Sequence, residues 1–226
     1  LIEGDLRATC AALAAQASVH RDTVMAGRTH LQHALPVTFG YKAAVWLAPL
    51  LNAIDKLPAV RAAALRLSFG GAAGTLASLG DQGLAVTREL AKELNLAPAE
   101  IPWHVARDSL AEAACWLGIL CGSLSKLATD FMLMMQTELG EVNEPHVRGR
   151  GGSSTMPQKR NPIACEYVLS QSRGVHALVP QVLAAMAQDF ERGTGPWQTE
   201  LLALPQAFLL AHGALAQARF IAEGMV

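Results

Sequence analysis

The sequence carries little charge. Only 16% of its 226 residues are Asp, Glu, Lys or Arg and the formal net charge is −1, whereas 51% are hydrophobic. A nearly neutral chain has no general attraction for nucleic acid or for an anionic lipid surface, which excludes both as bulk partners. Any anion that this protein binds must therefore be held by a local group of residues.

Features of membrane and secreted proteins are also scarce. Uninterrupted apolar runs, such as residues 43–51 and 113–122, are shorter than the ~18 residues expected of a membrane span. The first ten residues include Glu3, Asp5 and Arg7, so they contain no signal-peptide core. The four cysteines show no CxxC spacing and lie in apolar segments, which indicates reduced, buried thiols. We expect a cytoplasmic protein without a membrane partner.

Alternating strand patterns are missing as well, and helix-forming residues fill the chain between a few Gly and Pro junctions. The patterns predict helices over residues 4–26, 37–68, 81–95, 105–138, 162–188 and 198–223. Four prolines inside these ranges are expected to kink or shorten the helices: Pro49, Pro58, Pro180 and Pro205. The predicted fold class is all-α, a long-helix bundle that takes up residues 1–226. Because both ends look cut, we expect it to be the middle portion of a longer protein.

The predicted helix over residues 105–138 is apolar on two faces. One line of apolar residues steps by three and four from Leu110 to Met134, as in a coiled-coil-like bundle. A second line repeats every seven residues through Ala114, Cys121, Ala128 and Met135. A helix that is apolar on two faces must be buried on both. We therefore predict a bundle completed by other subunits through this helix, with a self-contained monomeric bundle as the alternative.

Residues 150–162, RGGSSTMPQKRNP, interrupt the helices with a polar and basic loop. Asn161 and Pro162 are typical of a helix start, whose free N–H groups carry about half a positive charge. Lys159 and Arg160 stand just before this start, so the sequence predicts a local anion site. A nearby ammonium would make the hydroxyl of Ser153 or Ser154 easier to ionise. A solvated linker is the alternative, and a P-loop is excluded because no GK[ST] follows the glycines.

A second polar loop is predicted over residues 27–36, GRTHLQHALP. His30 is a candidate general acid or base, since histidine titrates nearest to neutral pH. His30 and His33 as metal ligands are a rival hypothesis, although no third ligand has suitable spacing. A hydrogen-bonded loop histidine without a catalytic role is the remaining alternative.

Residues 152–162 match the signature of the fumarase/aspartase superfamily, GSSxMPxKxNP, at every specified position. Residues 27–32, GRTHLQ, resemble the upstream motif of the same superfamily, and residues 70–75, GGAAGT, resemble its glycine turn. The three motifs occur in the order found in the family. The sequence is identified as a member of this superfamily over essentially its whole length, which would correspond to the central helical domain, without the N-terminal part and the small C-terminal domain.

Within the superfamily, four short stretches resemble most the branch that lactonises 3-carboxy-cis,cis-muconate: residues 69–76, 102–104, 195–197 and 221–225. The resemblance implies a cycloisomerase of aromatic catabolism, in the β-ketoadipate pathway, that needs no metal or organic cofactor. Adenylosuccinate lyases are the next most similar branch, and a 3-sulfomuconate cycloisomerase is a further alternative. A non-catalytic oligomerisation domain, as in crystallin-type relatives, is the hypothesis from another class.

The resemblance also implies an assembly and a set of site residues. Family members are homotetramers whose active sites form where three subunits meet. Ser153 and His30 would be catalytic, with Ser153 on a flexible loop, and Glu166 would pair with His30 and orient it. Substrate binding would fall to Thr29, Gln32, Trp103, His104, Ser154, Lys159 and Asn161. The sequence departs from many relatives at Arg107-Asp108-Ser109, where a second arginine is common, so an arginine contact is expected to be lost.

Overall fold

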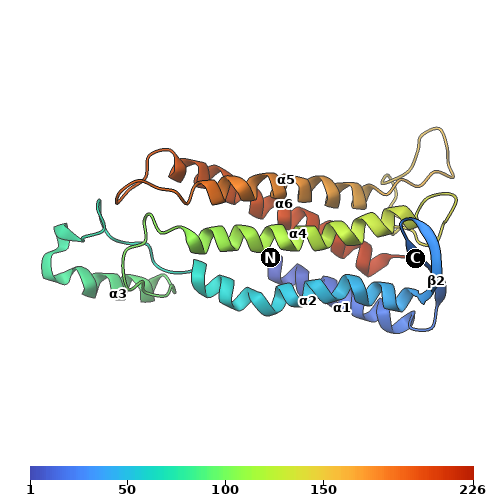
Figure 1. The fold of residues 1–226 in the computed structure, drawn as a ribbon, viewed down its shortest axis with the longest axis horizontal. Coiled ribbons are helices and arrows are strands. Elements are labelled where there is room, and N and C mark those ends of the chain that lie inside the picture. The colour runs from blue at the N-terminus through green and yellow to red at the C-terminus, as the bar shows by residue number, and fades with distance from the viewer.

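The computed structural model describes all 226 residues and is predominantly helical (Figure 1). Its six α-helices agree in order and approximate bounds with the six predicted from the sequence. They are α1 (Ile2–Val19), α2 (Phe39–Ala64), α3 (Gly83–Glu93), α4 (Asp108–Met134), α5 (Ile163–Ala184) and α6 (Pro196–Gly224). A short 3₁₀ helix, η1, spans Ala77–Gln82. The four internal prolines lie inside helices that continue past them, so none of these helices is shortened there.

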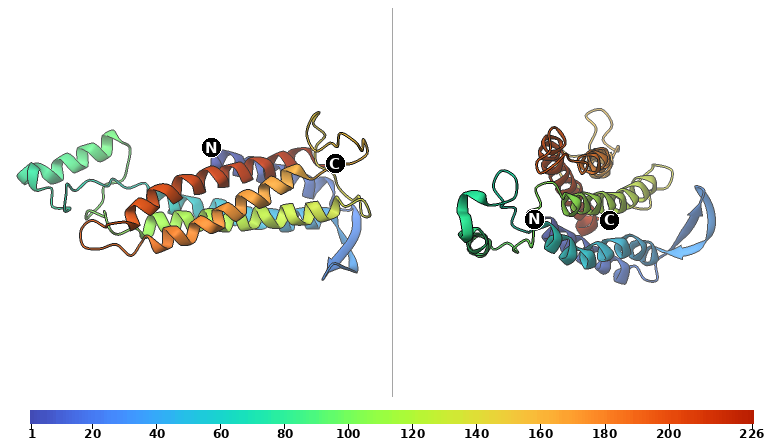
Figure 2. Two further views of the ribbon diagram at one scale, coloured as in Figure 1. Left: turned by 90° about the horizontal axis from the view of Figure 1, so that it is seen from above. Right: turned by 60° about the vertical axis from the view of Figure 1, so that its left-hand side comes forward.

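Five helices pack lengthwise into one bundle, and α3 lies apart from it at one end (Figures 1 and 2). Helix α4 runs between α2 on one side and the α5–α6 pair on the other. The loop between α4 and α5 lies at the end of the bundle opposite α3 (Figure 1). The bundle therefore has two distinct ends, which we call the loop end and the α3 end.

Helix α4 forms the centre of the hydrophobic core. Its first apolar line is confirmed, since Leu117, Leu120 and Leu124 are fully buried. The second line is buried along α4, with Ala114, Cys121 and Ala128 at 0% exposure within the single chain, and its last member, Met135, is half-buried just past the end of the helix. Within the chain α2, α5 and α6 cover this second face, so its burial needs no other subunit. Completion of the bundle by other subunits stays a prediction. Large apolar side chains remain exposed on several helices, among them Val45 of α2, Ile119 of α4, Tyr167 of α5, and Leu202 and Leu209 of α6.

Three helices are long and apolar enough to cross a membrane by length and composition alone: α2, α4 and α6. The uninterrupted apolar runs did not reveal this, because isolated polar residues break the runs while the mean hydropathy over 18 residues stays at 1.2 or above. Here these helices bury their apolar residues against one another in a common core of 32 residues.

A β-hairpin, unforeseen in the sequence, follows α1. Strands β1 (Val24–Thr29) and β2 (Gln32–Thr38) pair antiparallel, where a helix to residue 26 and a loop over 27–36 were predicted. The turn residues His30 and Leu31 both have positive φ, which gives the backbone twist of a two-residue hairpin turn. The hairpin projects from the loop end of the bundle (Figure 2). It ends where the Thr38 hydroxyl accepts the Tyr41 N–H and caps α2.

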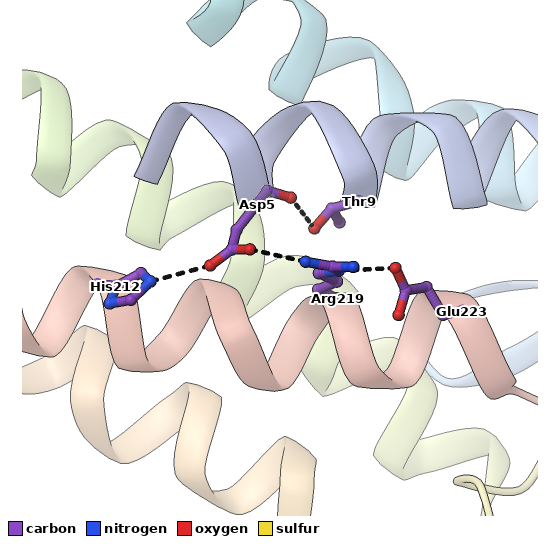
Figure 3. A network of polar contacts seen from close by, with 5 residues as sticks. All are labelled: Asp5, Thr9, His212, Arg219 and Glu223. Atoms are coloured by element: carbon purple, nitrogen blue, oxygen red, sulfur yellow. Dashed lines mark hydrogen bonds and ion pairs between the residues drawn. The ribbon is translucent and has the colours of Figure 1, made fainter. Parts of the chain in front are cut away.

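A polar network joins the first and last helices (Figure 3). Asp5 of α1 accepts hydrogen bonds from His212 Nε2 and Arg219 Nη1 of α6, both at 2.9 Å, and Arg219 also donates to Glu223. Burial alone would raise the pKa of Asp5, yet the hydrogen bonds and charges of Arg219 and His212 outweigh it and lower this pKa. The network thus fixes the register of α1 on α6 with a charged carboxylate.

Candidate functional site

Ser153 lies half-buried in the loop between α4 and α5. Its hydroxyl oxygen accepts the backbone N–H groups of Thr155 at 3.3 Å and Met156 at 3.2 Å, and it lies 3.3 Å from the Thr155 hydroxyl. Donors aimed at an oxygen stabilise its ionised form. The loop therefore places two N–H groups where a serine alkoxide would need them. The neighbouring Ser154 is exposed, and its hydroxyl forms no hydrogen bond with the Ser153 oxygen.

The loop is closed at its base by one backbone hydrogen bond. The Asn161 N–H donates to the Gly151 carbonyl oxygen at 2.8 Å, so the two ends of the loop formed by residues 152–160 lie next to each other. Gly151 has a φ of +71°, and a Cβ there would lie 2.9 Å from the Asn161 oxygen, so glycine is required. Beside this closure lies a cavity of about 130 Å³, lined by Lys159, Arg160 and Asn161 among others. A larger groove of about 820 Å³ on the α4 side shares Lys159 and Arg160.

The start of α5 corrects the predicted anion site. The helix begins at Ile163 with Pro162 as its N-cap, one residue later than predicted. Its Ala164 and Cys165 N–H groups donate to the two carboxylate oxygens of Glu144 at 3.0 and 2.9 Å. The prediction that these N–H groups are free to bind a substrate carboxylate is therefore wrong, because the protein supplies its own carboxylate. Burial and the charge of Glu144 also raise the pKa of the Cys165 thiol, which keeps it protonated.

Three predicted site residues, Thr29, His30 and Gln32, lie exposed at the tip of the hairpin. The hairpin is tied to the loop end by Arg28, whose guanidinium donates to both oxygens of Glu141 at 2.8 Å. This hydrogen-bonded pair raises the pKa of Arg28. The side chains of His30 and Glu166 are both exposed, and neither forms a hydrogen bond or ion pair within the chain, so the predicted pairing of the two is not made there. No group of three His, Cys, Asp or Glu residues lies close enough to hold a metal ion, which leaves the His30–His33 hypothesis without a third ligand.

Trp103 and His104 lie at the other end of the molecule, just before α4 begins. Trp103 is buried, donates its indole N–H to the Leu67 carbonyl at 2.9 Å, and has the guanidinium carbons of Arg66 and Arg107 at 5.3 and 5.0 Å from its ring centre. His104 lies within 3.3 Å of the Ser68 hydroxyl and 3.2 Å of the Gly71 carbonyl oxygen. In a single chain His104 therefore contacts the glycine turn and Trp103 the segment just before it. Helix α4, about 40 Å long at ~1.5 Å per residue, separates both residues from Ser153.

Arg107, the arginine that precedes the departure at Ser109, is also engaged internally. It forms a buried, two-pronged pair with Glu200 of α6, with its Nε 2.9 Å from one carboxylate oxygen. Arg192 in turn donates to the Gly71 and Ala72 carbonyl oxygens and stacks on Trp197. The stretches 69–76, 102–104 and 195–197 thus meet at the α3 end.

Several contacts around the loop had no signal in the sequence. Glu144 and Glu141 stand in EVNEP, which shows only two acids before a proline, and Arg28 is one basic residue in a polar segment. Their partners lie 20 and 113 positions away, a separation that no local pattern reports. An acidic residue shortly before a helix start can signal a cap. Glu144 gives no such signal, because capping residues lie within a few positions of the helix start.

The sequence profile of the family described as Lyase matches residues 1–176, more than three quarters of the chain. The chain belongs to this family, which lies within the fumarase/aspartase superfamily.

Several individual proteins of known name are similar to this chain over its whole length. A 3-carboxy-cis,cis-muconate cycloisomerase of Bradyrhizobium diazoefficiens is 50% identical over 224 residues, which cover 99% of this chain and 50% of that protein. The crystal structure of the 3-carboxy-cis,cis-muconate lactonizing enzyme from Pseudomonas putida matches with a TM-score of 0.95 at 47% identity, covering 100% of this chain and 50% of that one. Trans-aconitate decarboxylase 1 of Mycosarcoma maydis is 46% identical over 225 residues, which cover 100% of this chain and 46% of that protein. This chain spans about half the length of the curated relatives it matches.

Proposed function

We propose that the protein of which this chain is a part is a cycloisomerase that lactonises 3-carboxy-cis,cis-muconate. One substrate carboxylate oxygen adds to a carbon–carbon double bond that is conjugated with a second carboxylate. The electron pair of that double bond moves onto the second carboxylate, and a proton then joins the adjacent carbon to give the lactone. Relatives at 50% identity and a TM-score of 0.95 carry this activity in their names, which supports the choice of substrate.

Ser153 is the proposed proton donor. After its hydroxyl proton passes to carbon, the serine alkoxide that remains is held by the Thr155 and Met156 N–H groups, and it regains a proton from water. These two hydrogen bonds, at 3.3 and 3.2 Å, are the observation that carries the proposal, because they let a serine act as an acid and a base. His30 is the second proposed catalytic residue and Glu166 its orienting partner.

Cationic and amide side chains beside the loop closure are proposed to bind the substrate carboxylates. Lys159 and Arg160 line both hollows of the loop end, and Asn161 lines the smaller one. Because Glu144 already fills the start of α5, the negative charge of the intermediate falls to these side chains rather than to the helix terminus. Removing one such donor in other enzymes costs roughly 10²- to 10³-fold in rate. The substrate carboxylate itself is the electron sink, so the proposed reaction needs no cofactor.

The proposed assembly is a homotetramer with active sites shared between subunits. Trp103 and His104 lie at the α3 end and Ser153 at the loop end, separated by the length of α4, so one chain cannot bring them to one substrate. Exposed apolar residues on α6, including Leu201, Leu202 and Leu209, offer a surface for such an assembly. We place the enzyme in the cytoplasm, without nucleic-acid or membrane partners.

The activity is tested by incubating the full-length protein with 3-carboxy-cis,cis-muconate and following the loss of ultraviolet absorbance as the conjugated diene closes. Turnover is expected, and no change at high enzyme concentration would overturn the substrate. Parallel incubations test the two alternative substrates. Adenylosuccinate turnover would release fumarate, and 3-sulfomuconate turnover would remove the absorbance of the conjugated diene. Trans-aconitate is a fourth arm, since a relative at 46% identity is named a decarboxylase of that acid. Inactivity on all four, with intact folding, would favour the non-catalytic oligomerisation domain.

A further inference from the structure

The carboxylate of Glu144 occupies the start of α5 with both of its oxygens. Oε2 accepts the Ala164 N–H at 3.0 Å and Oε1 accepts the Cys165 N–H at 2.9 Å, and both hydrogen bonds are partly buried. The first turn of a helix leaves N–H groups without intrahelical partners and carries partial positive charge. Glu144 satisfies two of these donors from 20 positions upstream, outside the reach of an ordinary capping residue.

A short chain of backbone contacts connects this cap to Ser153. The Ile163 N–H donates to the Asn161 carbonyl oxygen at 2.9 Å, and the Asn161 N–H donates to the Gly151 carbonyl oxygen at 2.8 Å. Gly151 precedes Ser153 by two residues, so the helix start fixes both sides of the loop closure. A shift of the first turn of α5 would move the Ser153 hydroxyl and the Lys159 side chain together.

The segment that carries Glu144 is itself firmly held by contacts that do not involve Glu144. Glu141 pairs with Arg28 of the hairpin, and the buried Val142 packs in the core. Asn143 and Val226 exchange two backbone hydrogen bonds, of 2.8 and 3.1 Å. The carboxylate therefore extends from a fixed support toward the helix start.

We propose that Glu144 is a positioning residue, whose carboxylate holds the first turn of α5 and thereby sets the place of the loop that carries Ser153 and Lys159. The inference rests on the proposed function, because positioning has meaning only for a reaction at that loop. Misplacement of a reacting group by about 1 Å costs on the order of 10²-fold in rate. Loss of the carboxylate is therefore expected to lower kcat about 10- to 100-fold at a temperature where the protein stays folded.

The test replaces the carboxylate and then returns it. Glu144→Ala in the full-length protein is expected to lose kcat and to exchange the Ala164 and Cys165 amide hydrogens faster than the wild type. Sodium formate should restore both properties in the variant and change neither in the wild type, whereas uncharged formamide should restore neither. Glu138→Ala is the matched control, since Glu138 is exposed in the same connection and forms no hydrogen bond or ion pair; it is expected to behave as wild type.

The outcomes separate this inference from the proposed function. Formate that restores amide protection but not kcat would reduce Glu144 to a structural cap and overturn the positioning role. A wild type inactive on every substrate overturns the proposed function, and exchange that is equally slow in wild type and Glu144→Ala overturns the cap itself. Should Glu144→Ala not fold, Glu144→Gln keeps one acceptor oxygen and is expected to lower kcat with KM changed less than about threefold; an unchanged kcat would overturn the proposal.

Discussion

Ser153 and His30 differ in the hydrogen bonds that the single chain provides to them. The Ser153 oxygen is already held by two backbone N–H groups, while the His30 side chain is exposed at a hairpin tip without a partner. We predict that Ser153→Ala loses more activity than His30→Ala, since a positioned acid or base supplies ~10²- to 10⁴-fold and Ser153 would transfer its proton directly to carbon. Steady-state kinetics of both variants in the full-length enzyme measures this. Equal losses, or a fully active Ser153→Ala enzyme, would contradict the assignment.

Residue types alone located the candidate loop, because its glycines, serines and cations contrast with the apolar helices around it. What the residue types could not tell was which charges are already neutralised. Glu144 and Glu141 are used up by partners within the chain, and so is Arg107. A carboxylate or guanidinium is free to bind substrate only when it has no hydrogen-bonding partner within the fold. Local sequence does not show these partners, because they lie far away along the chain.

At the scale of elements, the hairpin shows how one glycine sets a local structure. Gly27 is the single residue opposite Ala34 and Leu35 at an irregularity in the pairing of β1 and β2. A Cβ at Gly27 would lie 2.4 Å from the Leu35 carbonyl oxygen, so no side chain fits there without moving the backbone. The hairpin was missed in the sequence because its turn, His30-Leu31, lacks the Asn-Gly or Gly-rich pair that marks such turns.

Gly27→Ala is therefore predicted to disorder the hairpin and to lower the free energy of unfolding by about 1–3 kcal/mol, in the range of overpacking a tight site. Gly4→Ala is the matched comparison, because Gly4 lies in α1 with no heavy atom within 4 Å of the added Cβ. That change should instead stabilise the helix by about 0.5–1 kcal/mol. Urea unfolding of both variants measures the contrast, and two changes of the same sign would refute the account of Gly27.

For the whole molecule, the Asp5 network ties stability to pH. The pKa of Asp5 is lower in the folded chain than in the unfolded chain, where it is about 3.9. The stabilisation is thus fully present above that value and is lost as the pH falls through the lower, folded pKa. Asp5→Asn is predicted to lower the free energy of unfolding by about 1–3 kcal/mol at pH 7, and the difference should vanish in strong acid.

Urea unfolding at several pH values provides the check on Asp5. Asp22→Asn is the control, because Asp22 is highly exposed and pairs only with the adjacent Arg21. That variant should differ little from wild type at any pH. A gap between Asp5→Asn and wild type that persists unchanged into strong acid would show that the carboxylate charge is not what stabilises the network.

Sharing of active sites between subunits makes a further prediction for the assembly. Ser153→Ala and His30→Ala enzymes, each inactive or weakened, should regain activity when denatured together and refolded as mixed oligomers. Mixed sites would then combine an intact hairpin from one subunit with an intact loop from another. Ser153→Ala mixed with Lys159→Ala is the control without recovery, since both residues lie on one loop. Absence of recovery in the first pair, with mixed oligomers verified, would place the whole site in one chain.

The sequence by itself determined the helices and the chemistry of one loop. Both are local properties: apolar residues recur with the period of a helix, and glycines, serines and cations cluster within a dozen positions. Only the tertiary structure decided that both faces of α4 are covered by their own chain. It alone showed that Glu144 fills the start of α5 and that Trp103 stands a helix length away from Ser153. Burial and pairing depend on residues far apart in the chain, so they are settled only when the helices pack.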